Sequence, residues 1–296
     1  MIRITMLGTS GATPTKLRSL PGVALSYEGN VFLFDCGEGT QMQLIRRGVN
    51  MSRIRAILLT HAHGDHVIGV AGLVRSLALA GRKEPLLIFV PKGYEGVVKS
   101  LVSFDKAGMT YPIGIRGVEP GKVYKGRDFT ISAFKLSHNI PACGYIFKTD
   151  DKKRFIKDKC SRLGLEGEMY SILQKKGRLR LGKKTVRISE VTRREAGKKI
   201  VYACDTRPSQ ATVAAARGAD LLIHEATYAD SEKGLARERA HSTASEAARI
   251  ARKAGARRLV LTHISARYKS QAQHEAESRK IFANAVVAKD GDDIFI

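Results

Sequence analysis

The sequence predicts one α/β domain over residues 1–296, with a basic arm over residues 152–199 inserted into it. Three observations predict this organisation. Short apolar runs bounded by Gly and Pro fill the first quarter of the chain. Apolar runs alternate with helical patterns after residue 200. The segment between these two regions has a very different composition. A chain of 296 residues is long enough to bury a full hydrophobic core in a single large domain.

The expected strands are short apolar runs, and the expected helices show apolar residues at helical spacing. Strands are predicted at Ile2–Leu7, Val23–Tyr27, Val31–Asp35, Ala56–Leu59, Leu86–Val90, Phe129–Leu136, Cys143–Phe147, Ile200–Cys204, Asp220–Glu225 and Arg258–Thr262. Helices are predicted after His66 through Leu77, and at Gly93–Phe104, Pro208–Arg217 and Ser242–Ala254.

Charge sets the inserted segment apart. The whole chain carries 51 Lys and Arg against 28 Asp and Glu, a net charge of +23. The segment Lys152–Lys199 holds 17 of the basic and 5 of the acidic residues, a net charge of +12. Such a balance favours a polyanionic partner. A solvated loop is the simpler interpretation of a charge run, but a structureless loop of this length is unusual in a compact domain. An arm that binds nucleic acid is therefore the favoured interpretation.

The cysteines and the apolar runs bear on the compartment. Cys36, Cys143, Cys160 and Cys204 form no close pair and have no metal-type spacing. In a chain without a secretion signal, buried free thiols and a reducing cytoplasm are expected. No apolar run reaches the ~18 residues that indicate a membrane span, so no membrane association is expected.

The strongest chemical signal is the cluster His61-Ala62-His63-Gly64-Asp65-His66. At this chain's His and Asp frequencies a chance match is on the order of 10⁻⁴. The cluster follows an apolar run and precedes a helix, which is where an α/β scaffold presents ligands. Imidazole and carboxylate both suit Zn²⁺. A tight loop can turn two of these side chains to each side, an arrangement that serves two metal ions.

Two metal ions need further ligands, and three isolated residues are candidates. His138, Asp205 and His263 each follow a separate apolar run. Each of them alone is more often a satisfied structural residue than a ligand. Three such residues at predicted strand ends, together with the cluster, favour a dinuclear metal site.

These residues resemble the metallo-β-lactamase superfamily, and within it the ribonuclease Z family of tRNA 3′-processing endonucleases. The resemblance covers nearly the whole chain and implies an αββα sandwich. Besides the metal cluster, it is carried by Leu7–Pro14, Asp35–Gln41, Ala203-Cys204-Asp205-Thr206, His224-Glu225-Ala226-Thr227 and His241-Ser242-Thr243. The glycine-rich stretch Asp35–Gln41 is by itself either a tight turn before a helix or a place where backbone approaches a phosphate.

The resemblance implies a role for each site residue. His61, His63 and His138 would hold one zinc ion, and Asp65, His66 and His263 would hold a second. Asp205 would bridge the two. Asp65 would also orient or deprotonate the attacking water, and His241, assisted by Glu225, would act near the leaving 3′-oxygen. Without the resemblance, His241 is better explained as a residue beside a helix N-cap. Glu225 and His224 are then better explained as a buried hydrogen-bonded pair.

The resemblance also implies the substrate and the assembly. The substrate would be precursor tRNA, cleaved to leave a 3′-hydroxyl on the tRNA, and the protein would be a homodimer. The basic segment resembles the arm with which the family clamps tRNA. It lacks the Gly-Pro usual there, because Leu163–Gly167 leads directly into Glu168. A small-molecule hydrolase or phosphodiesterase of the same fold is the alternative function, although it leaves the charge of +23 unexplained.

Overall fold

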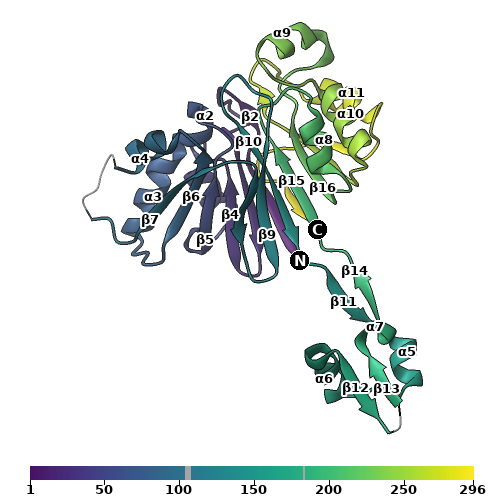
Figure 1. The fold of residues 1–296 in the computed structure, drawn as a ribbon. Helices are drawn as coiled ribbons and strands as arrows, with labels where there is room; N and C mark the ends of the chain where they lie inside the picture. The colour runs from purple at the N-terminus through teal and green to yellow at the C-terminus, as the bar shows by residue number, and fades with distance from the viewer. Residues whose placement is uncertain (104–107, 183) are drawn as a thin grey trace. The chain divides into compact units, whose positions relative to one another are not determined.

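The structure, a computed structural model, describes residues 1–103, 108–182 and 184–296. The chain forms two compact units (Figure 1). The body comprises Met1–Lys148 and Lys199–Ile296, and the inserted unit comprises Thr149–Lys198. The insertion interrupts the chain between two strands of the body that pair with each other, because Lys148 lies opposite Lys199 in their register.

The first sheet of the body is built largely from the N-terminal half of the chain. It has seven strands, in the order β20-β1-β3-β4-β5-β6-β7. The pairs at the β20 end are antiparallel, and those from β4 to β7 are parallel. The strands are β1 (Ile2–Gly8), β3 (Gly22–Tyr27), β4 (Asn30–Phe34), β5 (Ile54–Leu58), β6 (Leu86–Pro91), β7 (Ile113–Val118) and β20 (Asp293–Phe295).

The second sheet of the body comes from the C-terminal half together with the strands that precede the insertion. Its order is β19-β17-β16-β15-β10-β9-β8. The pairs from β19 to β15 are parallel, whereas β15 runs antiparallel to β10. The strands are β8 (Gly121–Lys125), β9 (Phe129–Lys135), β10 (Cys143–Thr149), β15 (Lys199–Ala203), β16 (Leu221–Glu225), β17 (Leu259–Thr262) and β19 (Ala285–Val287). A short pair, β2 (Ser10–Gly11) with β18 (Ile264–Ser265), joins the two halves.

Three hydrophobic clusters define the layers of the body. One contains side chains of both sheets, such as Phe32, Phe34, Tyr145 and Tyr202, so the sheets pack face to face. The other two lie between a sheet and its helices, which gives the order helix–sheet–sheet–helix (Figure 1). The first sheet is covered by α1 (Thr40–Arg46), α2 (Gly64–Val67), α3 (Gly69–Leu79) and α4 (Glu95–Ser103). The second sheet is covered by α8 (Gln210–Ala216) and α10 (Ala244–Ala254), and α11 (Ala272–Arg279) contacts its edge strand β19 and α10.

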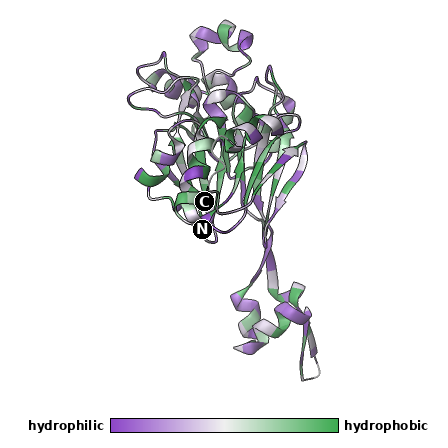
Figure 2. Cartoon of the chain, turned by 90° about the vertical axis from the view of Figure 1, so that its left-hand side faces the viewer, coloured by the Kyte–Doolittle hydropathy of each residue, from purple (hydrophilic) through white to green (hydrophobic). Residues whose placement is uncertain are grey.

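This arrangement is the αββα sandwich that the resemblance implied. Hydrophobic residues are frequent in the strands, whereas the helices contain both hydrophilic and hydrophobic residues (Figure 2). The remaining elements of the body are the short helices η1 (Met51–Arg53), η2 (Asp230–Glu232) and α9 (Lys233–Glu238). In the part of the chain that the structure covers, no helix is both long and apolar enough to cross a bilayer.

The inserted unit is folded and has its own small core. That core contains Cys160, Leu165, Leu173, Val186 and Val191. The unit contains two antiparallel strand pairs, β11 with β14 and β12 with β13, and three short helices. The elements are β11 (Lys152–Phe155), α5 (Lys157–Arg162), α6 (Glu168–Lys176), β12 (Arg178–Leu181), β13 (Lys184–Arg187), α7 (Ile188–Val191) and β14 (Thr192–Glu195). The long basic segment is therefore not a structureless loop.

The ten predicted strands are all present, with ends that differ by one or two residues. Asp35 was expected to end a strand, but its φ of +58° places it in the turn after β4. The helix expected at Gly93–Phe104 begins later, at Glu95, and Phe104 lies outside the described residues. The sequence did not indicate α9 or α11, nor the edge strands of either sheet, and it indicated α1 only as a helix after the glycine-rich turn.

Candidate metal centre and active site

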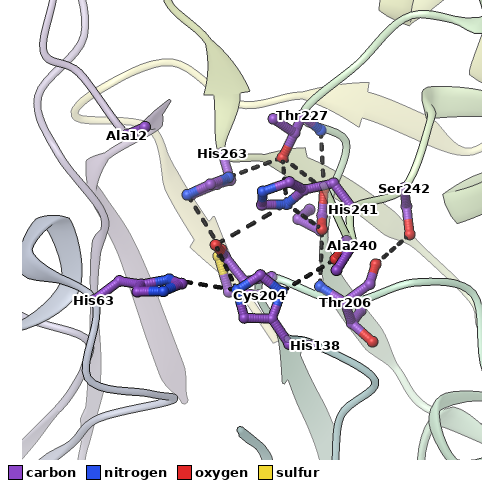
Figure 3. A network of polar contacts seen from close by, with 12 residues as sticks. Ala12, His63, His138, Cys204, Thr206, Thr227, Ala240, His241, Ser242 and His263 are labelled. Carbon is purple, nitrogen blue, oxygen red and sulfur yellow. Dashed lines mark hydrogen bonds and ion pairs between the residues drawn. The ribbon is translucent and has the colours of Figure 1, made fainter. Parts of the chain in front are cut away.

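The candidate ligands are presented by loops that follow strands. His61, His63, Asp65 and His66 follow β5, which ends at Leu58. The other three candidates follow strands of the second sheet: His138 follows β9, Asp205 follows β15 and His263 follows β17. The two sheets thus contribute to a single cluster of side chains (Figure 3).

The ligands form two groups, and the first consists of the imidazoles of His61, His63 and His138. Asp205 faces this first group through its Oδ2 atom. That oxygen lies 3.6 Å from Nε2 of His61 and 4.0 Å from Nε2 of His138. Nδ1 of His63 lies 3.0 Å from Nε2 of His61 and 3.4 Å from Nε2 of His138. These four ligand atoms all lie within 4.8 Å of one another.

The second group faces the other oxygen of the same carboxylate. Oδ1 of Asp205 lies 3.3 Å from Nε2 of His66 and 3.1 Å from Nε2 of His263. These two nitrogens lie 3.3 Å apart. Oδ2 of Asp65 completes the group, 3.4 Å from Nε2 of His66 and 3.5 Å from Nε2 of His263.

Both groups suit a tetrahedral ion. Zn–N and Zn–O bonds of about 2.0–2.2 Å place neighbouring ligand atoms about 3.3–3.6 Å apart in a tetrahedron. The separations in the second group, 3.1–3.5 Å, match this requirement closely. The first group is slightly more open. The seven residues could therefore hold two ions, with the carboxylate of Asp205 shared between them.

Hydrogen bonds to the far ring nitrogens orient four of the histidines. Nδ1 of His138 lies 3.1 Å from the carbonyl oxygen of Ala240, which can only accept, so this nitrogen carries the proton and Nε2 is left with a lone pair. Nδ1 of His66 lies 2.9 Å from the carboxylate of Asp35. Nδ1 of His61 contacts Oγ1 of Thr60 at 3.0 Å, and Nδ1 of His263 contacts Oγ1 of Thr227 at 2.9 Å. Such outer contacts are typical of metal-binding histidines.

Cys204 lies beside the second group but is a poor ligand candidate. Its Sγ lies 3.3 Å from Oδ1 of Asp205 and can donate its proton to that carboxylate. Burial and the neighbouring charge of Asp205 raise the pKa of the thiol well above its usual value. Only a thiolate binds metal strongly, so Asp65 is the better fourth member of this group.

The two carboxylates of the cluster are in the ionised form that a metal requires. Burial opposes ionisation of Asp205, but the surrounding imidazoles, His263 and His66 first among them, hold its pKa well below the usual value. Burial also opposes ionisation of Asp65, and hydrogen bonds with the same two histidines lower its pKa. The amide of Ala12 donates a further hydrogen bond of 3.0 Å to Asp65.

Asp205 and His263 share an uncommon backbone conformation. Their φ angles are +52° and +59°, in the left-handed region that side-chain-bearing residues seldom occupy. Both residues come one or two positions after a parallel strand, where the chain has to turn. Such conformations concentrate at functional sites, where the surrounding structure enforces them.

Asp35 is a site residue whose role the sequence did not reveal. It is fully buried and accepts hydrogen bonds from the hydroxyls of Thr60 and Tyr202 as well as contacting His66. Its position at the start of the stretch Asp35–Gln41 was the available signal. Its three partners come from two separate segments, residues 60–66 and strand β15, and one sequence does not show that these segments meet at Asp35.

The glycines of that stretch permit close packing of backbone against backbone. A side chain at Gly37 would approach the carbonyl oxygen of Asp65 to 2.3 Å, and one at Gly69 would approach the carbonyl oxygen of Gly37 to 2.0 Å. The amide of Cys36 donates to the carbonyl oxygen of His66 at 2.8 Å. The stretch therefore forms a tight turn before α1 that holds the metal-cluster loop in place.

Glu225 and His241 form a separate pair beside the second group. Oε1 of Glu225 lies 2.9 Å from Nδ1 of His241, and the carboxylate is fully buried. Burial disfavours the charged imidazole, but the charge and hydrogen bond of Glu225 outweigh this effect and raise the pKa of His241 to about 9. Glu225 also accepts hydrogen bonds from the amides of Thr206 and Thr227. The N-cap of the next helix is Thr243, so His241 lies two residues before the cap and is directed into the site (Figure 3).

Comparison with known proteins relates this chain to enzymes. Residues 23–146 match the model of the metallo-β-lactamase superfamily, and residues 159–264 match that of a β-lactamase superfamily domain. A ribonuclease Z of Methanosarcina acetivorans is 40% identical over 294 residues, covering 98% of this chain and 96% of the relative. A ribonuclease Z of Gemmatimonas aurantiaca is 41% identical over 298 residues, covering 98% and 95%.

A solved structure agrees with these relatives. The short form of human tRNase Z is similar with a TM-score of 0.72 and 27% sequence identity, over 99% of each chain. The metallo-β-lactamase fold protein YhfI of Bacillus subtilis has a TM-score of 0.71 at 20% identity, over 99% of this chain and 98% of that one. The second likeness concerns the fold alone.

Proposed function

The chain belongs to the ribonuclease Z family of the metallo-β-lactamase superfamily, and on that premise we propose that it is a two-zinc endoribonuclease that removes 3′ trailers from tRNA precursors and leaves a 3′-hydroxyl on the tRNA. One observation carries the proposal: the two oxygens of Asp205 each face a separate group of ligand atoms. A carboxylate in that position suits a pair of ions, as hydrolysis of a phosphodiester often requires.

We assign the ligands as follows. One zinc ion would be held by His61, His63 and His138, and the other by Asp65, His66 and His263. Asp205 would contribute one carboxylate oxygen to each. When bound, two such ions supply a hydroxide near neutral pH and Lewis acidity toward the phosphate oxygens. The donor set supports zinc over calcium or magnesium, because hard cations prefer oxygen ligands and this set is mostly imidazole.

Asp65 has a second task in this proposal. Its Oδ2 is directed to His66 and His263, which leaves Oδ1 to orient the attacking water. The hydrogen bond from the amide of Ala12 to Oδ2 fixes the rotation of the carboxylate. A ligand that also positions the nucleophile contributes through proximity as well as through charge.

His241 is the proposed proton donor to the leaving 3′-oxygen. Its Nδ1 faces Glu225, so Nε2 is the nitrogen that can reach substrate. The carboxylate of Glu225 stabilises the protonated imidazole and fixes the plane of its ring. Proton transfer by a positioned histidine typically contributes 10²- to 10⁴-fold to the rate.

The inserted unit is the proposed tRNA-binding exosite. The β12–β13 pair has an apolar face and a basic face. Leu179 and Val186 pack on the small core. The exposed side chains include Arg178, Arg180 and Arg187. Arg178 lies directly opposite Arg187 in the register, and like charges in such positions oppose strand pairing. A polyanion bound on this face would relieve that repulsion. Phosphates of the tRNA body are the ligands that the proposal provides.

We also propose a homodimer. Met42, Ile45, Ile68 and Leu79, on or beside α1 and α3, expose between 50% and 76% of their surface. Exposed apolar side chains on neighbouring helices often mark an interface with a second copy of the chain. Light scattering of the purified protein would test the dimer, and Ile45→Lys should shift it toward monomer.

The cytoplasm is the proposed compartment. All four cysteines are free and buried, as expected for a protein of a reducing compartment. The proposed substrate, precursor tRNA, fits the same assignment.

Cleavage of a defined precursor tests the proposed function. A tRNA with a 3′ extension is incubated with zinc-loaded protein, with and without a chelator, and both product ends are mapped. We expect one cut at the 3′ end of the mature tRNA, a 3′-hydroxyl on that fragment, and loss of cleavage with chelator. Hydrolysis of small thioesters or lactams without any cleavage of the precursor would favour the small-molecule alternative.

A further inference from the structure

A basic hollow lies next to His241 and plays no part in the metal centre. Its volume is about 600 Å³, within the range of ligand pockets. It is lined by Arg207, Pro208, Lys233, Gly234, Arg237, His241 and Glu246. All of these residues belong to the body of the protein, and Lys233, Gly234 and Arg237 are part of α9, which is labelled in Figure 1.

The hollow is strongly cationic, and its positive charges do not stabilise the fold through ion pairs. Lys233 and Arg237 occupy positions i and i+4 of α9, where like charges destabilise a helix. Within residues 1–103, 108–182 and 184–296, neither they nor Arg207 form an ion pair. The one carboxylate of the lining, Glu246, accepts a hydrogen bond of 3.0 Å from the amide of Thr243 in a capping box. Three cations are thus available to an anionic ligand.

The wall of the hollow is fixed relative to the active site. The amide of Arg207 donates to the carbonyl oxygen of Ser137, the residue before His138, at 2.8 Å. Nε of Arg207 donates to the carbonyl oxygen of Arg237 at 3.3 Å, which ties this loop to α9. The amide of His241 donates to the carbonyl oxygen of Ala236 at 2.8 Å. The same segments therefore position the candidate metal ligand His138, the candidate proton donor His241 and the three cations.

We infer that Arg207, Lys233 and Arg237 form a subsite for the last nucleotide that the tRNA retains, and bind the phosphate on its 5′ side. The inference rests on the proposed function, in which His241 protonates the leaving 3′-oxygen. That oxygen belongs to the ribose of the retained nucleotide, so this nucleotide lies on the His241 side of the scissile phosphate. Guanidinium and ammonium groups are the common binders of phosphate, and the hollow has room for a ribose and a base.

A double-mutant cycle between protein and RNA tests the subsite. The protein variant is Lys233→Ala with Arg237→Ala, both exposed positions on one face of α9. The RNA variant is a mature tRNA shortened by its last nucleotide and the 5′ phosphate of that nucleotide. The control protein is Arg239→Ala, an exposed cation next to α9 that pairs with Glu238 and does not line the hollow. Metal content and melting temperature are checked for each protein.

For the wild-type protein, we expect the full-length mature tRNA to bind about 10- to 100-fold more tightly than the shortened one, as charged hydrogen bonds imply. The double variant should lose that preference, and Arg239→Ala should keep it. The salt dependence of binding to the full-length tRNA should also flatten in the double variant, by about 0.7 per lost phosphate contact. A purely structural effect would weaken binding of both RNAs equally.

Two results would overturn the subsite. One is an unchanged preference in the double variant. The other result would come from a 5′-phosphorylated oligonucleotide of the trailer, used as an inhibitor of cleavage. If the double variant selectively lost inhibition by this oligonucleotide, the hollow would lie on the opposite side of the cut. Failure of the proposed function gives a different result, because the wild-type protein would then cleave no precursor in the first place.

Discussion

Oδ2 of Asp35 lies 2.9 Å from Nδ1 of His66, and both side chains are fully buried. The carboxylate can only accept, so Nδ1 of His66 carries a proton, and Nε2, on the side of Asp205 and His263, is the nitrogen available to a metal ion. Without a metal ion, burial opposes the charged form of His66, but Asp205 and Asp35 raise its pKa well above the usual value, so a bound ion would displace a proton from Nε2. A carboxylate outside the ligand set thus orients a ligand inside it.

We expect Asp35→Asn to lower zinc affinity about 10- to 100-fold, the usual effect of removing an outer hydrogen-bond partner. The amide can donate to Nδ1 of His66 and so favour the wrong tautomer. Zinc affinity is measured by competition with a chelator of known affinity. Asp293→Asn, which alters an exposed pair with Arg3, serves as control. Equal affinities in wild-type and Asp35→Asn protein would contradict the role given to Asp35.

His241→Ala should lower the single-turnover rate on precursor tRNA by about 10²- to 10⁴-fold, because it removes the proposed proton donor. It should leave the metal content unchanged, since His241 is not assigned as a ligand. Asp65→Ala should instead abolish cleavage and reduce metal content. A His241→Ala protein that lost its metal, or that cleaved at full rate, would refute the separation of these two roles.

The inserted unit can be removed with a small change to the body. Lys148 and Lys199 are paired across neighbouring strands, so a short Gly-containing turn can replace Thr149–Lys198. We expect the shortened protein to bind tRNA more weakly and with a flatter salt dependence, because phosphate contacts are lost. Its metal ligands all lie in the body, so metal content should be unchanged.

A charge-only variant separates the arm's cations from its fold. Arg178→Gln, Arg180→Gln and Arg187→Gln together change the exposed face of β12–β13 and leave the small core alone. The matched control replaces three exposed cations of the body, Lys99, Lys122 and Lys253, with Gln. Affinity for tRNA is measured at several salt concentrations. If tRNA affinity fell equally steeply with salt concentration in the two triple variants, this face would have no role in tRNA binding.

The sequence predicted the centre of the fold better than its edges. Strands such as β6 and β17 are runs of apolar residues, because parallel strands are buried on both faces. Edge strands such as β7 and β8 are only partly buried, and their mixed composition carries no clear pattern. The short helix α9 has no N-cap hydrogen bond from a side chain and buries only Ala236, so it too left no signal.

The site shows the same division between local and non-local information. His61 through His66 form one local motif, visible in the sequence as a unit. His138, Asp205 and His263 each stand alone, and their convergence depends on the packing of two sheets. The partners of Asp35 come from separate segments, and the hollow beside His241 depends on how α9 packs. Neither could be predicted without coordinates.

His274 should make the fold sensitive to acid. It is fully buried, next to the ring of Tyr268. Burial first, and then the charge of Arg18, lowers its pKa to about 4, although the backbone of Ala226 and the charge of Asp230 act in the opposite direction. The unfolded chain protonates this group near its ordinary pKa of 6.5. It therefore holds more protons than the native state between these values, and stability falls as the pH drops from about 6.5 to 4.

The expected loss from His274 alone is about 3 kcal/mol at pH 4, at ~1.4 kcal/mol for each unit of pKa difference. His274→Leu should lose less stability than wild type over this interval. Denaturant unfolding at pH 7, 6, 5 and 4 gives both curves, and Gln273→Leu on the exposed side of α11 is the control. Parallel curves for wild type and His274→Leu would show that another group is responsible.

The number of metal ions per chain tests the central claim most directly. Two groups of ligand atoms share the carboxylate of Asp205, and the account requires an ion in each. Protein is loaded with zinc, freed of excess metal and examined by elemental analysis against an accurate protein concentration. We predict two zinc ions per chain, and fewer than two in Asp205→Ala. One ion or none in the fully loaded wild-type protein would contradict the dinuclear site.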